Sequence, residues 1–150
     1  MDRGREFVRW AAVAAAGMYG ITGLAYAGSA GTPVHLWLAT LWLILGCAVG
    51  AAGFGQERAS GGGRVFALLA LAILVGAGLA IEAMGLDIGG NAISGQSVPG
   101  LVHPLGFLVS WPAFLLALVE GVFALGSDNR GDGISSGWSG EGGGSEPTGF

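Results

Sequence analysis

Four long apolar runs constrain the fold of this chain more than any other feature. They cover residues 7–27, 34–54, 65–86 and 101–125 approximately. A helix rises about 1.5 Å per residue, so each run is long enough to cross the roughly 30 Å hydrocarbon core of a bilayer. Only 11% of the 150 residues are charged, whereas a typical soluble domain has about a quarter. We predict an all-α integral membrane protein whose domain, residues 1–126, is a four-transmembrane-helix bundle with short loops.

The segment after the fourth run has a different composition. Residues 127–150 are rich in glycine and serine, acidic, and nearly free of aliphatic side chains. Such a segment buries too little apolar area to offset the entropy lost on ordering. We therefore predict a disordered C-terminal tail.

Arginine placement predicts the orientation. The chain has no lysine, and its six basic residues are arginines at the N-terminus, between the second and third runs, and in the tail. The connections at residues 28–32 and 87–100 carry none. Because cytoplasmic loops are enriched in basic residues, both termini are predicted to be cytoplasmic, in a multi-pass protein of the cell (plasma) membrane.

The first run has a second interpretation. Arg3 and Arg5 precede it, Arg9 lies at its start, and Ala25-Tyr26-Ala27 near its end matches the small-residue pattern of a signal-peptide cleavage site. The apolar stretch is long for a signal peptide, however, and its small residues recur every four positions, as in packed membrane helices. We predict a retained helix, with cleavage before Gly28 as the alternative.

Small residues also mark the expected helix contacts. Ala12, Ala16 and Gly20 share one face of the first run, and Gly46 and Gly50 follow the same spacing in the second. Small side chains at this spacing let two helix backbones approach closely. We predict that each of these helices packs closely against another helix.

Several functional classes find no support. The chain has no Walker A, H-E-x-x-H or C-x-x-C motif, and its segments outside the apolar runs are too short for a catalytic domain. The net charge of −4 argues against binding nucleic acid. Cys47 is the only cysteine, so no intrachain disulfide can form. We expect no enzymatic activity and no partner nucleic acid.

Four titratable residues are expected to gather at the outer ends of the helices. His35 begins the second run, Glu82 and Asp87 end the third, and His103 begins the fourth. Imidazole and carboxylate groups suit Zn²⁺ or Cu²⁺, so these four residues are the candidate metal ligands. The two histidines could also ligate a haem, although both lie near helix ends. Their shallow depth favours a structural or interfacial role for the histidines over metal or haem binding, and no cofactor is expected.

A second hypothesis is a proton or ion path. It would use Glu82, Ser110, Pro112 and Glu120. Pro112 cannot donate a backbone hydrogen bond, so it frees a carbonyl oxygen near the middle of the fourth run. Buried carboxylates and freed carbonyl groups are features of conduction paths.

The sequence thus favours a structural or accessory subunit of a membrane assembly. Short loops leave little surface for chemistry, whereas the sides of the helices offer contact with lipid and with other membrane proteins. The expected partners are the lipid bilayer and either further copies of the chain or a larger membrane complex. The alternatives are a proton or ion channel or transporter, and a haem- or metal-binding redox subunit.

Overall fold

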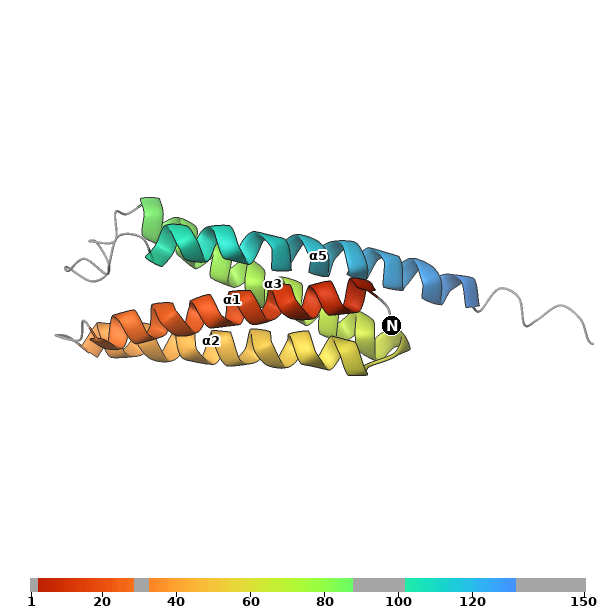
Figure 1. Ribbon diagram of the computed structural model, residues 1–150, viewed down its shortest axis with the longest axis horizontal. Coiled ribbons are helices and arrows are strands. Elements are labelled where there is room, and N and C mark those ends of the chain that lie inside the picture. Colours follow the sequence, from red (N-terminus) through yellow and green to blue (C-terminus); the bar gives the residue numbers. More distant parts are fainter. Residues whose placement is uncertain (1–2, 29–32, 88–101, 132–150) are drawn as a thin grey trace, which may run out of the picture.

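The computed structural model describes residues 3–28, 33–87 and 102–131, which form four long helices (Figure 1). In chain order they are α1 (Arg3–Gly28), α2 (Pro33–Arg58), α3 (Gly61–Asp87) and α5 (Val102–Gly131). All four are long and apolar enough to cross a membrane. The predicted all-helical fold with four apolar helices is therefore confirmed for the described residues.

The second and third helices extend further than the apolar runs predicted. α2 continues to Arg58 and α3 begins at Gly61, so the expected loop at residues 55–64 shrinks to Ala59 and Ser60. Gly61 has a φ of 53°, a left-handed conformation that glycine adopts readily, and it allows the chain to reverse here. Glutamine, glutamate and arginine are good helix formers, which explains why α2 extends past its apolar part.

α5 also extends beyond its apolar run. It continues to Gly131, so residues 127–131 of the predicted disordered tail are helical. These residues contain no proline, and their first glycine is the last residue of the helix. The rest of the predicted tail, residues 132–150, lies outside the described residues. The predicted connections around residues 29–32 and 88–101 lie outside them as well.

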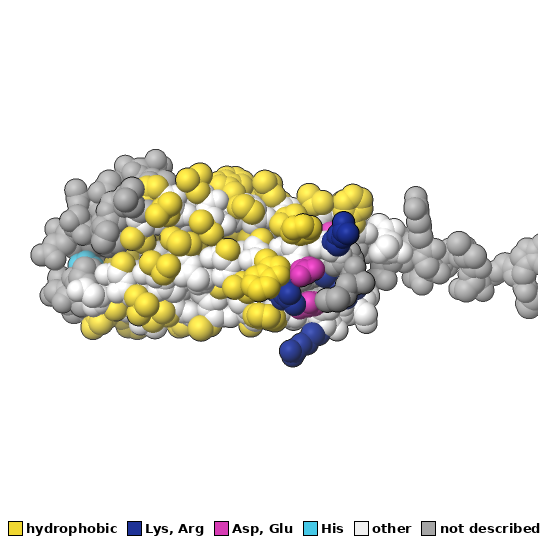
Figure 2. Space-filling view, viewed as in Figure 1, with side chains coloured by type: hydrophobic (Ala, Val, Ile, Leu, Met, Phe, Trp, Pro, Cys, Tyr) yellow, Lys and Arg dark blue, Asp and Glu magenta, His cyan; other side chains and the backbone are white. Residues whose placement is uncertain are grey.

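The helices run alternately up and down and form a ring in the order α1, α2, α3, α5 (Figure 1). Each helix contacts both its neighbours, and the largest contacts are α1 with α2 and α3 with α5. Charged side chains gather at one end of the bundle and histidine at the other (Figure 2). We call these the arginine end, which holds Arg5, Arg9 and Arg64, and the histidine end, which holds His35 and His103.

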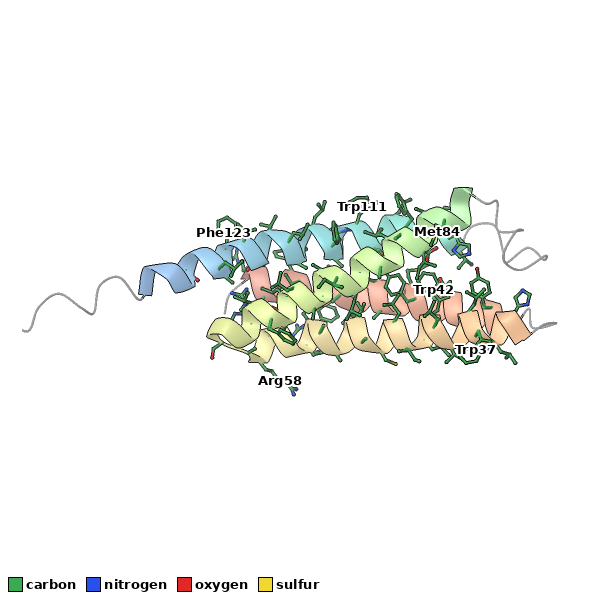
Figure 3. All side chains as sticks on the ribbon, turned by 180° about the vertical axis from the view of Figure 1, so that it is seen from behind. Trp37, Trp42, Arg58, Met84, Trp111 and Phe123 are labelled. Carbon is green, nitrogen blue, oxygen red and sulfur yellow. The ribbon has the colours of Figure 1, made fainter. Side chains whose placement is uncertain are left out.

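Apolar and aromatic side chains from all four helices fill the interior. Trp42 of α2 points into the bundle, where its ring centroid lies 5.2 Å from that of Tyr19 on α1 (Figure 3). The fully buried apolar and aromatic residues are Val8, Ala12, Ala15, Tyr19, Trp42, Val49, Leu68, Leu71, Val75 and Ala113. Three of them are alanines, so the helices pack closely around a narrow core.

The contact between α1 and α2 depends on glycine. A Cβ atom built at Gly46 would lie 3.0 Å from the carbonyl oxygen of Ala16 and 3.5 Å from the backbone nitrogen of Gly20. A Cβ atom at Gly53 would overlap the side chain of Ala12. The close packing predicted from the spacing of small residues is confirmed at this interface.

The sides of the bundle are apolar. Hydrophobic side chains cover the visible face between the two ends (Figure 2). Trp37 is 77% exposed, Phe66 75% and Phe123 70%. Many large apolar side chains therefore point outward, while several polar ones are buried.

Candidate functional site

The histidine end contains a buried cluster of three polar side chains, one from each of three helices. Glu82 of α3 is fully buried, and one of its oxygens, Oε2, lies 2.5 Å from Nδ1 of His103 on α5. The hydroxyl of Tyr26 on α1 lies 2.9 Å from Nε2 of the same imidazole. We call Tyr26, Glu82 and His103 the Glu82 cluster.

Antiparallel packing brings these residues together. Tyr26 lies in the last turn of α1 and His103 in the first turn of α5. The end of α1 and the beginning of α5 are therefore at the same level of the bundle. Glu82 comes slightly more than one turn before the end of α3. Gly106, one turn after His103, makes room for the carboxyl group, because a Cβ atom there would lie 2.9 Å from Cδ of Glu82. Any larger residue at position 106 would displace Glu82.

The protonation states of Glu82 and His103 decide which atoms donate in the two hydrogen bonds of the cluster. An ionised carboxylate only accepts, so Nδ1 of His103 donates to Glu82 when the carboxyl group is charged. Nε2 of a neutral imidazole then accepts from the Tyr26 hydroxyl. When the imidazole is positively charged, Nε2 donates to the Tyr26 oxygen instead. The phenol can serve both states because a hydroxyl donates and accepts.

The four predicted metal ligands are placed as follows. Glu82 and His103 are in contact, and His35 is buried at the same end, with its ring centroid 6.2 Å from that of Tyr26. Asp87 is the last residue of α3, and its side chain lies outside the described residues.

The described side chains do not form a metal site by themselves. Among them, no three histidine, cysteine, aspartate or glutamate residues are grouped closely enough to hold an ion. Both ring nitrogens of His103 are already hydrogen-bonded, so a metal would have to replace Tyr26 or Glu82 as the partner of one of them. The prediction of a four-ligand site depends on Asp87.

Tyr26 is the member of the cluster that the sequence did not reveal. It lies 77 residues before His103 and stands inside the Ala-Tyr-Ala pattern that suggested a cleavage site. A tyrosine at the end of an apolar run is also common at membrane surfaces. The antiparallel order of the helices was the one available signal, since it places the end of the first run beside the start of the fourth.

A second group of polar side chains lies deeper in the bundle. The Tyr19 hydroxyl donates to the carbonyl oxygen of Val75, at 3.3 Å, and also interacts with Ser110. Ser110 donates to the carbonyl oxygen of Gly106, at 2.7 Å. The indole nitrogen of Trp42 is buried and has no hydrogen-bond partner among the described residues. Polar groups therefore reach about two helical turns inward from the histidine end.

The residues predicted for a proton path do not form one continuous row. Glu82 and Ser110 face the interior, but Pro112 is exposed on the side of the bundle, in a helix that continues through it. Glu120 lies at the arginine end, where its Oε2 is 2.7 Å from Nη2 of Arg64. Buried apolar residues occupy the interior between Ser110 and Glu120. They are Leu68, Leu71, Ala113 and Ala117.

Ion pairs and charged hydrogen bonds join the helices at the arginine end. Arg9 of α1 pairs with Glu57 of α2 at 2.7 Å. Arg5 donates to the carbonyl oxygens of Glu57 and Ala59, both at 3.2 Å, and so satisfies acceptors at the end of α2. Gln56 donates to the carbonyl oxygen of Arg5 at 2.9 Å. These hydrogen bonds and this ion pair hold α1 and α2 together at the arginine end.

Comparison with known proteins adds no relative: no family model, curated protein or solved structure matches this chain.

Proposed function

We propose that this protein is a multi-pass protein of the cell membrane in which all four helices span the bilayer. One observation carries the proposal: the bundle exposes large apolar side chains and buries polar ones. Trp37 and Phe123 are 77% and 70% exposed, whereas Glu82 is 0% exposed. In water, an apolar surface this extensive would promote aggregation. In a bilayer the same surface contacts hydrocarbon, and the buried carboxyl group avoids it.

The proposal places the arginine end, with both chain termini, in the cytoplasm. Arg5, Arg9, Arg58 and Arg64 all belong to helix ends on this side, and the described residues of the histidine end include no arginine. The positive-inside rule then puts the histidine end on the outer side. α1 stays in the mature protein as the first span.

Within the membrane, we propose a structural or accessory role in a larger assembly. Outside the helices, the described part of the chain between α2 and α3 is only Ala59 and Ser60. The sides of the helices therefore provide most of the surface through which this domain can meet another protein. Transport of protons or ions is the alternative that the Glu82 cluster favours, and a redox subunit is the alternative that would require haem or metal.

Cysteine labelling tests the orientation. In a Cys47→Ala background, Ser60→Cys is expected to react with a membrane-impermeant maleimide only after the cell membrane is opened, because it lies at the arginine end. Gly28→Cys, at the histidine end, is expected to react in intact cells. The reverse pattern would contradict the orientation. N-terminal sequencing of the same material is expected to begin ahead of α1, and a new terminus at Gly28 would contradict the four-span proposal.

Purification in a mild detergent tests the assembly. We expect the tagged protein to migrate as a particle larger than one chain plus its micelle, and to retain either further copies or a defined set of membrane proteins, identified by mass spectrometry. A harsher detergent that separates the helices of different chains serves as the control. A monomer without retained proteins would contradict the accessory role, and a Soret band or bound metal in stoichiometric amount would favour the redox alternative.

A further inference from the structure

We propose that the Glu82 cluster is a proton-binding site, reached by protons from the water phase at the histidine end and closed toward the arginine end. The chemical ligand is the proton itself, delivered by a hydronium ion. This inference does not depend on the accessory role, because it concerns the interior of one chain.

The burial of Glu82 is the first step of the argument. Its side chain has no exposed surface, and one oxygen, Oε1, has no hydrogen-bond partner among the described residues. A lone carboxylate in the hydrocarbon region of a bilayer is strongly unfavourable, most of all at the centre of a helix and less near its ends. The Glu82 carboxylate therefore needs a compensating positive charge or a proton.

His103 is the group that supplies this compensation. The titratable side chains that interact with Glu82 are Tyr19 and Tyr26 from α1 and His103 from α5. His35 from α2 lies beside Tyr26 at the same end. The arginines of the described residues lie at or near the arginine end, away from Glu82. The carboxyl group and the imidazole together are electrically neutral when they hold one proton between them. Losing that proton leaves a negative charge in the bundle, and gaining a second leaves a positive one.

Tyr26 provides the route for the second proton. Glu82 is fully buried, whereas Tyr26 and His103 are 6% and 7% exposed, so an incoming proton meets these two first. In the state with a protonated carboxyl group and a neutral imidazole, the Tyr26 hydroxyl donates to Nε2. A hydronium ion gives a proton to the phenol oxygen as the phenol passes its own proton to Nε2. The products are water, an intact phenol and an imidazolium ion.

The other end of the site is closed. Ser110 and Glu120 are ten residues apart on α5, a rise of about 15 Å. Between them the interior includes the buried apolar residues Leu68, Leu71, Ala113 and Ala117. No titratable side chain of the described residues bridges this layer. A proton bound at Glu82 therefore returns by the route through which it entered.

Infrared difference spectroscopy on the purified full chain tests the site. The pH is changed between about 8 and about 5, the range in which histidine takes up its proton. We expect acidification of wild type to add imidazolium bands and to shift the carbonyl band of the protonated Glu82 carboxyl group. Glu82→Gln loses the carboxyl band, and His103→Gln loses the part of the imidazolium bands that His103 contributes. Glu120→Gln, a matched change at the arginine end, keeps both. Circular dichroism and size-exclusion chromatography verify that each variant is folded.

Two further variants test the geometry while Glu82 and His103 stay in place. Gly106→Ala places a methyl group against the Glu82 carboxyl group, so we expect its band to shift in frequency. Tyr26→Phe keeps the Glu82–His103 bond but removes the relay, so the difference spectrum is expected to appear more slowly after a pH jump, on the order of a hundredfold. An unchanged spectrum in Glu82→Gln, or an unchanged rate in Tyr26→Phe, would overturn the proposal.

Vesicles containing a pH-sensitive dye test the closed end. Acidification of the outer solution is expected to change the lumenal pH no faster in vesicles with wild-type protein than in vesicles without protein. A proton flux that Glu82→Gln abolishes would overturn the closed site and support the transport alternative. A flux that survives the double variant Glu82→Gln, Glu120→Gln does not pass through these carboxyl groups. Such a flux would also contradict the claim that the apolar layer blocks protons.

Discussion

Replacing His103 by leucine is expected to lower the free energy of unfolding by about 3–5 kcal/mol near neutral pH, the cost of leaving a buried charge without its partner. His103 is the described residue that directly hydrogen-bonds the Glu82 carboxyl group. Its removal leaves a fully buried carboxylate with no positive charge nearby. Reversible unfolding in mixed detergent micelles, followed by circular dichroism, measures the change.

The double variant Glu82→Leu, His103→Leu is the control. Replacing both partners of a buried pair by apolar side chains is often neutral or stabilising, so we expect it to unfold within about 1 kcal/mol of wild type, or above it. A lower pH also weakens the effect of His103→Leu, because a protonated Glu82 is neutral. The difference in unfolding free energy between this variant and wild type therefore shrinks as the pH falls. A loss of less than about 1 kcal/mol in His103→Leu at neutral pH would contradict the buried pair.

Replacing Gly46 by leucine is expected to cost about 1–3 kcal/mol or more, through overpacking of the α1–α2 interface. A Cβ atom at this position already meets the carbonyl oxygen of Ala16 at 3.0 Å and the backbone nitrogen of Gly20 at 3.5 Å. These are backbone atoms, so they cannot move aside as a flexible side chain could. The two helices must separate, and buried contacts along their length are lost. The same unfolding measurement in mixed micelles gives the change.

Gly17→Leu is the matched control for that substitution. Gly17 lies on the exposed side of α1, and a Cβ atom there has no neighbour within 4 Å. The same glycine-to-leucine change therefore adds a side chain to the surface without overpacking. We expect a change in unfolding free energy close to zero or slightly stabilising, because leucine is the better helix former. Equal losses in the two variants would show that Gly46 is not at a close helix contact.

The arrangement of the cluster also bears on the alternative fate of α1. Tyr26 stands immediately before Ala27, so cleavage before Gly28 would remove it together with the whole of α1. The buried face of this helix includes Val8, Ala12 and Tyr19. Its loss would open one side of the bundle and expose Glu82 and His103. Retention of α1 is therefore the interpretation under which these polar groups are covered.

The sequence by itself determined the helices and the separation of their two ends. A run of about 20 apolar residues has few stable conformations in hydrocarbon other than a helix, because every backbone polar group must be paired internally. Arginine clusters and histidines at alternate connections then divided the bundle into two ends. The helix limits predicted from the apolar runs were less accurate than the number of helices. The reason is that α2, α3 and α5 extend into polar residues beyond these runs.

Only the tertiary structure decided which faces point inward. The runs are apolar all round, so no polar stripe in the sequence indicates how each helix is rotated about its axis. Rotation placed Pro112 on the surface and Ser110 inside, although they are two residues apart. It also paired His103 with Tyr26, a residue 77 positions away that no motif in the sequence singles out. The composition of each run specified a membrane helix, and packing between the helices specified the polar site inside them.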